Sequence, residues 1–239
     1  MERHEYSRIS TNEESHFWYK ANREFSIDLL ENHCHLSGTN HILDAGCGVG
    51  GTTVALKKYG HVTGIDIHPL AIKFSGKYTI DRLIKADVNK LPFKRDSFDL
   101  VTSFDVLYHK DVDPTKAMAE MYRVLKPGGW VLIRFPAFEF LRGGHDLVVQ
   151  TGRRFTASQL AKLIRTVGFK INYLSYFNLV LFLPSLIWRN TKSKSSSDVI
   201  KLWPPLNFLL YIMLKIESKF ALNINLPFGT SVYCLAQKI

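Results

Sequence analysis

Cysteine is scarce in this sequence, and no apolar run is long. The 239 residues include three cysteines, at positions 34, 47 and 234, and none belongs to a C-x-x-C pair. This usage argues against a disulfide framework and a structural zinc site, and it is typical of a reducing cytoplasm. The first eight residues are polar and no apolar core follows them, so we expect no signal peptide and a cytoplasmic protein.

Acidic residues are fewer than basic ones. The chain has 21 Asp and Glu against 31 Lys and Arg, which gives a net charge of +10. Such a charge would suit a nucleic acid, but the basic residues are dispersed and no aromatic–basic recognition motif appears, so we expect no nucleic-acid partner. The hydrophobic content of 46% and the length predict one well-filled α/β domain over residues 1–239.

A short apolar strand followed by closely spaced glycines is present at residues 41–50, which read HILDAGCGVG. Gly46, Gly48 and Gly50 can adopt positive φ and let a ligand approach the bare backbone. A helix expected over residues 52–59 would point its free N–H groups at that ligand. The segment therefore predicts a nucleotide-like ligand.

Two ligand classes fit these glycines. Residues 46–51 read G-x-G-x-x-G and Asp66 follows Gly46 by twenty residues, as in a nicotinamide-dependent oxidoreductase. Asp44 favours another class, because a carboxylate before the first glycine would repel a pyrophosphate but can accept hydrogen bonds from an amino-bearing ligand. S-adenosylmethionine (SAM) is such a ligand, and LDAGCGVGGTT resembles the first motif of class I SAM-dependent methyltransferases.

Further segments resemble the same family in order. In VTGID at 62–66, the resemblance implies that Asp66 accepts from the ribose hydroxyls. In LIKADV at 83–88, it implies that Asp87 accepts from the adenine amino group and that the Val88 N–H reaches a ring nitrogen. Residues 91–93, 97–101 and 125–133 match at the family's spacing. The implied SAM site comprises Asp44, Gly46, Cys47, Gly48, Gly50, Asp66, Ile67, Asp87, Val88, Phe104, Trp18 and Arg23.

The resemblance also implies the fold, an α/β, Rossmann-like, doubly wound sheet of seven strands whose last strand lies antiparallel beside the fifth. The resemblance places strand four over 98–104, and the residue pattern itself predicts strands over 169–177 and 230–236. It further predicts a helix that begins at Asp113-Pro114 and another that begins with a Thr156–Gln159 capping box.

The N-terminal cap of residues 1–35 is expected to contain one helix over residues 13–30. This helix carries His16-Phe-Trp-Tyr19 and Arg23. Many methyltransferases of this type open with a similar aromatic helix that closes over the cofactor, which assigns Trp18 to the cofactor and Arg23 to its methionine carboxylate. A helix that only docks its aromatic residues on the sheet also fits the pattern.

Two histidines are candidate catalytic bases. Methyl transfer from a sulfonium is a direct displacement, so the protein aligns the acceptor and, for a hydroxyl or ammonium acceptor, removes a proton. His109 follows the strand at 98–104 and His145 lies in the loop after the fifth strand, where ligands of such sheets bind. A helix-start histidine bonded to backbone also fits His109. Arg153 and Arg154 could bind an anionic acceptor or simply be solvated.

A metal is not expected. Quinone-biosynthetic O-methyltransferases carry an acid-x-x-acid-His metal pattern after strand four, and this chain resembles it in part. Asp105 and His109 would share a helical face, but Tyr108 stands where the second acid would be. Two ligands seldom make a specific site.

Residues 178–228 depart from a minimal methyltransferase and are interpreted as a helical insertion. They contain six Lys and Arg against one Asp and one Glu. This combination fits an interfacial helix pair on anionic lipid or a lid over an amphipathic acceptor, while a hairpin packed on its own domain or on the second subunit of a homodimer fits as well. The large apolar groups that need such burial are Phe182, Leu186, Trp188, Trp203, Phe208, Leu209 and Ile212.

The sequence is thus interpreted as an enzyme that transfers a methyl group from SAM to oxygen or nitrogen of a small-molecule or lipid-linked acceptor. The protein is expected in the cytoplasm, with a peripheral membrane contact through residues 178–228 left open. A nicotinamide-dependent oxidoreductase and a non-catalytic SAM-binding partner protein are the alternatives.

Overall fold

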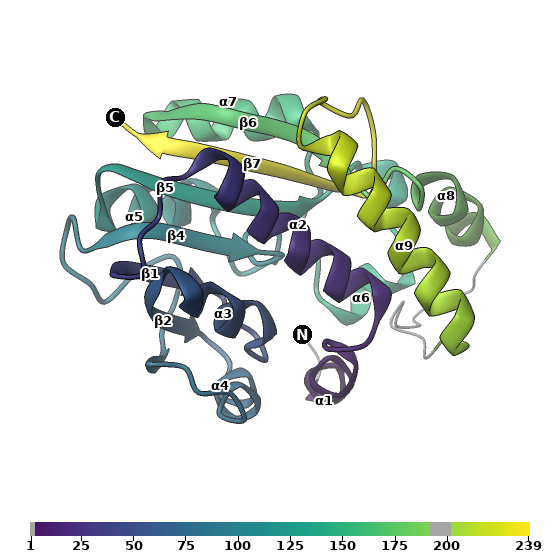
Figure 1. The fold of residues 1–239 in the computed structure, drawn as a ribbon, viewed down its shortest axis with the longest axis horizontal. Helices are drawn as coiled ribbons and strands as arrows, with labels where there is room; N and C mark the ends of the chain where they lie inside the picture. Colours follow the sequence, from purple (N-terminus) through teal and green to yellow (C-terminus); the bar gives the residue numbers. More distant parts are fainter. Residues whose placement is uncertain (1–2, 192–201) are drawn as a thin grey trace.

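A seven-stranded sheet forms the middle layer of the structure, a computed structural model that describes residues 3–191 and 202–239 (Figure 1). The strand order is β3-β2-β1-β4-β5-β7-β6. β7 runs antiparallel to β5 and β6, and the neighbours from β3 to β5 are parallel. The strands are β1 (Asn40–Ala45), β2 (Gly60–Asp66), β3 (Arg82–Lys85), β4 (Phe98–Phe104), β5 (Leu125–Pro136), β6 (Phe169–Phe177) and β7 (Ser231–Lys238).

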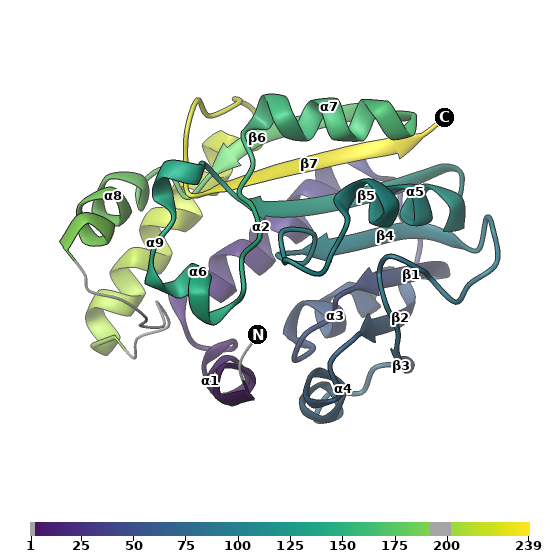
Figure 2. The same cartoon turned by 180° about the vertical axis from the view of Figure 1, so that it is seen from behind.

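Helices cover both faces of this sheet. α2, α3 and α9 lie over the face seen in Figure 1, and α5 and α7 lie over the face seen in Figure 2. α1 packs on α4. The helices are α1 (Arg3–Asn12), α2 (Phe17–His33), α3 (Gly51–Ala55), α4 (Pro69–Ser75), α5 (Pro114–Val124), α6 (Gly144–Val148), α7 (Ala157–Val167), α8 (Phe182–Thr191) and α9 (Pro204–Ala221), with 3₁₀ turns η1 (Leu56–Tyr59) and η2 (Glu139–Leu141).

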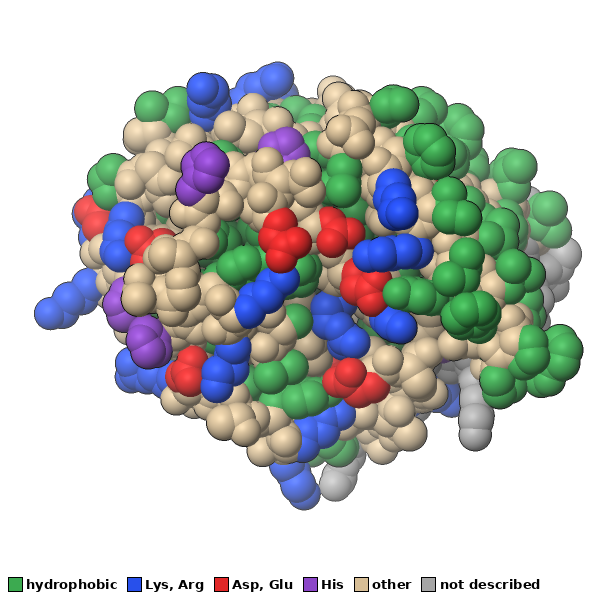
Figure 3. Space-filling view, in the orientation of Figure 1, with side chains coloured by type: hydrophobic (Ala, Val, Ile, Leu, Met, Phe, Trp, Pro, Cys, Tyr) green, Lys and Arg blue, Asp and Glu red, His purple; other side chains and the backbone are tan. Residues whose placement is uncertain are grey.

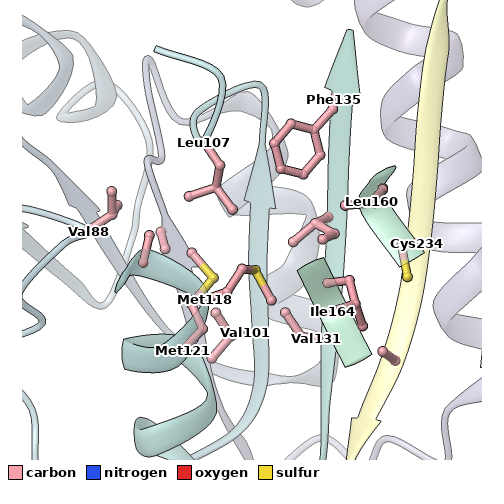
Figure 4. Packing of buried hydrophobic residues seen from close by; sticks show 14 of the residues in the cluster. Val88, Val101, Leu107, Met118, Met121, Val131, Phe135, Leu160, Ile164 and Cys234 are labelled. Carbon is pink, nitrogen blue, oxygen red and sulfur yellow. The ribbon is translucent and has the colours of Figure 1, made fainter. Parts of the chain in front are cut away.

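The larger part of the core lies between the sheet and the pair α5–α7. Met118 and Met121 of α5 meet Leu160 and Ile164 of α7 over Val131 of β5 (Figure 4). All five side chains are fully buried. The four residues of α5 and α7 lie at helical spacing within their helices, which is why the sequence predicted both helices correctly.

The local start signals also act as predicted. The Asp113 carboxylate accepts from the Thr115 N–H at 2.9 Å and begins α5. In the capping box of α7, the Thr156 N–H donates to Gln159 Oε1 at 2.9 Å and the Gln159 N–H donates to Thr156 Oγ1 at 3.2 Å. The seven-stranded sheet with its last strand antiparallel beside β5 is confirmed.

The helix expected over residues 13–30 was given the wrong first residue. It begins at Phe17 as α2, and residues 13–16 separate it from a preceding helix, α1, that was not expected. His16 ends the break, because its Nδ1 accepts from the Trp18 N–H at 3.3 Å and so caps α2. The helix expected over 52–59 is the short α3 followed by the tighter turn η1.

Residues 178–228 contain the helices α8 and α9, as the interpretation of a helical insertion expects. Within the described ranges, no helix combines the length and the apolar character needed to cross a membrane. Three of the six Lys and Arg counted in this segment, Lys192, Lys194 and Lys201, fall outside the described residues. For Trp188 and Arg189 the structure describes the backbone only.

Candidate functional site

The glycine turn after β1 lies at the edge where the parallel strands end. Gly46, Gly48 and Gly50 have φ values of 92°, 54° and 97°, which favour glycine. At Gly46 a Cβ would overlap the side chain of Val106, so the turns after β1 and β4 pack closely. At Gly48 a Cβ would meet nothing within 4 Å. The backbone of Gly48 is therefore open to a ligand.

Asp66, the last residue of β2, lies against this turn. Its Oδ2 accepts from the Gly48 N–H at 3.1 Å and its Oδ1 accepts from the His68 N–H at 2.9 Å. Burial raises the pKa of Asp66, and the two N–H donors act in the opposite direction. Ile67 beside it is 61% exposed, although it is a large apolar residue. The pair offers a carboxylate and an apolar surface to one ligand.

The third acid is at the same edge. Asp87 follows β3, which is tied to the end of β2 because the Ala86 N–H donates to the Asp66 carbonyl at 3.0 Å. Asp87 Oδ1 accepts from the backbone and side-chain N–H groups of Asn89, at 2.8 and 3.0 Å. Val88 is buried. The structure thus places Asp66 against the glycine turn and Asp87 at the same edge of the sheet, next to Asp66 across the β2–β3 pair.

Asp44 lies inside the protein rather than on the open face of the turn. It is 2% exposed, and its two oxygens accept from the hydroxyls of Thr53 at 2.6 Å and Thr102 at 2.8 Å. Burial raises the pKa of Asp44 to about 6, the two hydroxyls oppose this, and Asp66 raises the pKa further. The observed contacts join β1 to α3 and β4, and a direct bond to a ligand stays a prediction.

The N-terminal segment closes over the glycine turn. Glu13, between α1 and α2, accepts from the Gly51 N–H at 3.0 Å and from the Tyr78 hydroxyl at 2.8 Å. A Cβ at Gly51 would come within 3.1 Å of Arg23 Nη1, so the predicted Arg23 does reach this turn. The sequence reasoning missed Glu13, as well as Tyr6 of α1, whose ring stacks on His68 at 4.6 Å.

A partly buried ion pair joins the ends of β4 and β5. The Arg134 guanidinium donates to Asp105 Oδ2 and, at 3.1 Å, to the Tyr233 hydroxyl. It also lies 4.8 Å from the Trp18 ring and 5.5 Å from the Phe104 ring. Asp105 raises the pKa of Arg134 above its ordinary value, so the guanidinium stays charged. Trp18 and Phe104, both predicted site residues, therefore meet here.

His109 is half-buried just beyond this pair. Its N–H donates to the Val106 carbonyl at 3.1 Å, and its ring lies 4.4 Å from that of Tyr108. Burial lowers the pKa of His109, so the imidazole is neutral near pH 7 and can accept a proton. The expected helical face shared with Asp105 was wrong, because Asp105 has a φ of 56° and residues 105–113 form turns.

His145 is half-buried in α6, next to a second buried ion pair. Arg154 donates to both oxygens of Asp146, at 2.9 and 3.0 Å, and these two side chains are 5% and 2% exposed. The interpretation of Arg154 as a solvated or anion-binding residue was therefore wrong, since its donors are used inside the protein. Arg153 is exposed.

No cluster of three His, Cys, Asp or Glu side chains suited to a metal occurs in the described part of the chain. The cysteine of the glycine turn, Cys47, is buried, and burial raises the pKa of its thiol. Cys47 therefore lines the turn as a neutral group.

Aromatic rings gather beyond the end of β5. Phe138, which follows β5, stacks on Tyr176 at 4.7 Å and on Phe140 at 5.0 Å. Phe182 of α8 lies 5.9 Å from Phe138 and 5.0 Å from Phe228. We call these five side chains the aromatic cluster. They connect the end of β5 to α8.

Comparison with known proteins shows similarity to methyltransferases. A family model described as a methyltransferase domain matches residues 43–133. The demethylmenaquinone methyltransferase of Clavibacter sepedonicus is 34% identical over 143 residues, which cover 56% of this chain and 56% of that protein. The sterol 4-C-methyltransferase strm-1 of Caenorhabditis elegans is 35% identical over 116 residues, which cover 42% of this chain and 34% of that protein. The chain thus spans about a third to somewhat over half of these relatives.

A solved structure shows the same fold. The geranyl diphosphate C-methyltransferase of Streptomyces coelicolor A3(2), crystallised with Mg²⁺, geranyl diphosphate and S-adenosyl-L-homocysteine, matches with a TM-score of 0.60. The match has 17% sequence identity and covers 92% of this chain and 78% of that chain. The expected Rossmann-like methyltransferase fold is confirmed.

Proposed function

Since the chain belongs to the class I SAM-dependent methyltransferase family, we propose that it transfers a methyl group from SAM to oxygen or nitrogen of a small-molecule or lipid-linked acceptor. One observation carries this proposal. The glycine turn and the acid that ends β2 are joined by the bond from Gly48 to Asp66, and the turn is open beside that bond.

The residues at the open turn fit SAM. Asp66 would accept from the ribose hydroxyls, and Ile67 would cover one face of the adenine. Asp87 and the Val88 N–H would meet the adenine edge, and Arg23 would meet the methionine carboxylate. Asp44 would act mainly by fixing the turn, since both of its oxygens already accept from hydroxyls.

Bound SAM supplies a methyl group on a positively charged sulfur, which leaves two tasks to the protein. It must align the acceptor with the methyl group, and it must remove a proton from a hydroxyl or ammonium acceptor. His109 is the better candidate for the second task, because its lowered pKa keeps the imidazole neutral near pH 7. His145 is the second candidate. The ion pair Asp105–Arg134 joins the ends of β4 and β5. Its guanidinium also contacts the Trp18 ring.

The acceptor class follows from the aromatic cluster. Phe138, Phe140 and Phe182 offer an apolar surface at the acceptor end, which suits an amphipathic molecule better than a fully polar one. The named relatives point the same way, since one is a demethylmenaquinone and another a sterol methyltransferase. We place the protein in the cytoplasm, with the segment 178–228 as its contact to the acceptor or to a membrane.

Labelled SAM tests this proposal. The protein is incubated with methyl-labelled SAM and separate pools of phenolic, amine and isoprenoid-linked acceptors, and label is measured in the extracted products. Transfer to an oxygen or nitrogen acceptor is the expected result, and Asp66→Ala is the matched control that should lose it. Binding of SAM without labelled product from any pool would favour the non-catalytic partner protein. Binding of NAD instead of SAM would restore the oxidoreductase alternative.

A further inference from the structure

Helix α9 directs its polar side chains toward the protein. Asn207 accepts from the Phe17 N–H at 2.9 Å, and Tyr211 donates to Glu24 at 2.9 Å. Lys215 pairs with Glu24 at 3.0 Å, and Glu217, 6% exposed, accepts from the Leu179 N–H at 2.8 Å. These four polar residues are thus bonded to α2 and to the turn after β6, and Lys219 near the end of the helix is exposed.

Five apolar residues of the same helix point outward, whereas Leu214 and Ala221 are buried. The five follow each other at spacings of three and four residues, which places them on one face of a helix. Their exposed fractions run from 38% to 59%: Leu206, Leu209, Met213, Ile216 and Phe220. An ordinary surface helix has the opposite arrangement, with its apolar face buried against the protein.

Neighbouring elements extend this face. Leu183 and Ile187 of α8 are 63% and 67% exposed, and Trp203, just before α9, is 72% exposed. Hydrophobic side chains accordingly gather at the end of the molecule where α8 and α9 lie (Figure 3). We call the exposed apolar residues of α8 and of 203–228 the apolar rim. Single exposed apolar residues are normal, but a continuous group of this size marks an interaction surface.

The apolar rim is continuous with the acceptor end of the sheet. Phe228 at its border lies 5.0 Å from Phe182, which in turn lies 6.1 Å from Phe140 and 5.9 Å from Phe138. Phe140 is itself 61% exposed. Apolar side chains therefore run without interruption from the outer surface to the end of β5.

Charge and shape favour a lipid surface as the occupant. The chain has a net charge of +10, and the acidic residue of α9, Glu217, is buried while Lys219 is exposed. A second copy paired along α9 would cover the narrow stripe from Leu206 to Phe220 but would leave Trp203 and α8 uncovered. A bilayer interface accepts protruding aromatic and aliphatic side chains from several elements at once.

We propose that the apolar rim docks on the surface of an anionic phospholipid bilayer, with α8 and α9 lying in the interface. The acceptor end of the sheet then faces the lipid, and a lipid-linked acceptor reaches it along the aromatic cluster; this last step rests on the proposed function. Docking itself requires neither SAM nor an acceptor.

Vesicle co-sedimentation tests the docking. The full chain is mixed with vesicles of phosphatidylcholine alone or of phosphatidylcholine with phosphatidylglycerol, at low and at high salt. We expect binding to the anionic vesicles that weakens with salt, because basic side chains contribute near a negative surface. Ile216→Gln should reduce the partition coefficient into the vesicles about tenfold. The reason is that about half of the isoleucine side chain is exposed in the free protein, and this apolar surface would otherwise be buried in the bilayer.

Ile239→Gln is the matched control. Ile239 is also an exposed isoleucine, with 79% of its surface accessible, but it lies at the C-terminus, far from α9 (Figure 1). Its replacement should therefore leave vesicle binding unchanged. SAM affinity, measured by calorimetry on both variants, reports that each is folded. Equal binding by Ile216→Gln and the parent would overturn the proposal, as would absence of binding to every vesicle. A dimer that Ile216→Gln dissociates would overturn it in favour of a second copy.

The two proposals fail in different ways. Vesicle binding without transfer to any acceptor would reject the proposed function and leave the docking intact. Transfer to a soluble acceptor without vesicle binding would reject the docking and leave the proposed function intact.

Discussion

Asp44→Asn separates a structural role of the first acid from contact with the cofactor. Asp44 is 2% exposed and bonded to two hydroxyls, and burial raises the pKa of its carboxyl from 3.8 to about 6. Asparagine has nearly the same shape but carries no charge at any pH. The hydroxyls of Thr53 and Thr102 can rotate to accept from its amide as well as to donate.

The raised pKa of Asp44 determines whether the free energy of unfolding rises or falls with pH. A carboxyl whose pKa is raised by folding contributes stability that is present below its unfolded pKa and is lost as the pH rises through its folded pKa. For Asp44 this window runs from about pH 4 to about pH 6. The shift of about two pKa units corresponds to about 3 kcal/mol, at about 1.4 kcal/mol per unit.

Urea unfolding of the parent and of Asp44→Asn between pH 4 and pH 8 measures this effect. The free energy of unfolding of the variant, relative to that of the parent, should rise by about 3 kcal/mol across the window and stay constant above it. A difference that does not change with pH would refute the assignment of the buried charge.

Calorimetry with SAM on the same variant addresses the cofactor. If Asp44 acts only through Thr53 and Thr102, the affinity should change by less than threefold, about 0.7 kcal/mol. A loss of about 1.5–3 kcal/mol would instead show that the carboxylate accepts directly from the ligand.

Three further substitutions test the other parts of the site. Asp66→Ala should weaken SAM binding by about 1.5–3 kcal/mol in calorimetry, and unchanged affinity would remove Asp66 from the cofactor site. His109→Gln should lower kcat by about 10² to 10⁴ while leaving SAM affinity unchanged. Because burial lowers the pKa of His109, the kcat of the parent should rise with pH through a value below the ordinary 6.5, and a variant that keeps this rise would exclude His109 as the base. Glu13→Gln should speed hydrogen exchange in α1 about tenfold by weakening the bonds to Gly51 and Lys77, and unchanged exchange would show that α1 is held elsewhere.

The parts of the fold that the sequence predicted well are those set by local signals. Asp113 and Thr156 cap helices through bonds that span two or three residues, so the sequence contains both partners within one turn. The strand-end acids Asp66 and Asp87 follow apolar runs whose ends are visible in the same way. These positions could be assigned without the structure.

The missed features depend on contacts between distant parts of the chain. Glu13 lies 38 residues from Gly51, and Thr102 lies 58 residues from Asp44. Nothing in the sequence near Glu13 indicates that this residue lies between two helices and that its carboxylate accepts from the glycine turn. Arg154 was misread for a different reason: its partner Asp146 is only eight residues away, but the residue pattern does not show that α6 turns this carboxylate inward to a buried pair.

Helix α2 connects the two halves of the site. Arg23 reaches the glycine turn, and Trp18 lies on the Arg134 guanidinium between the turn and the acceptor end. The next residue after Arg23, Glu24, accepts from Tyr211 and pairs with Lys215, which holds the inner face of α9. The polar residues of α9 are thus required on the inside because α2 presents charge there. The outer face then carries Leu206, Leu209, Met213, Ile216 and Phe220, with Lys219 near its end. The proposed docking surface thus follows from the way α9 is bonded to α2, the helix proposed to close over the cofactor.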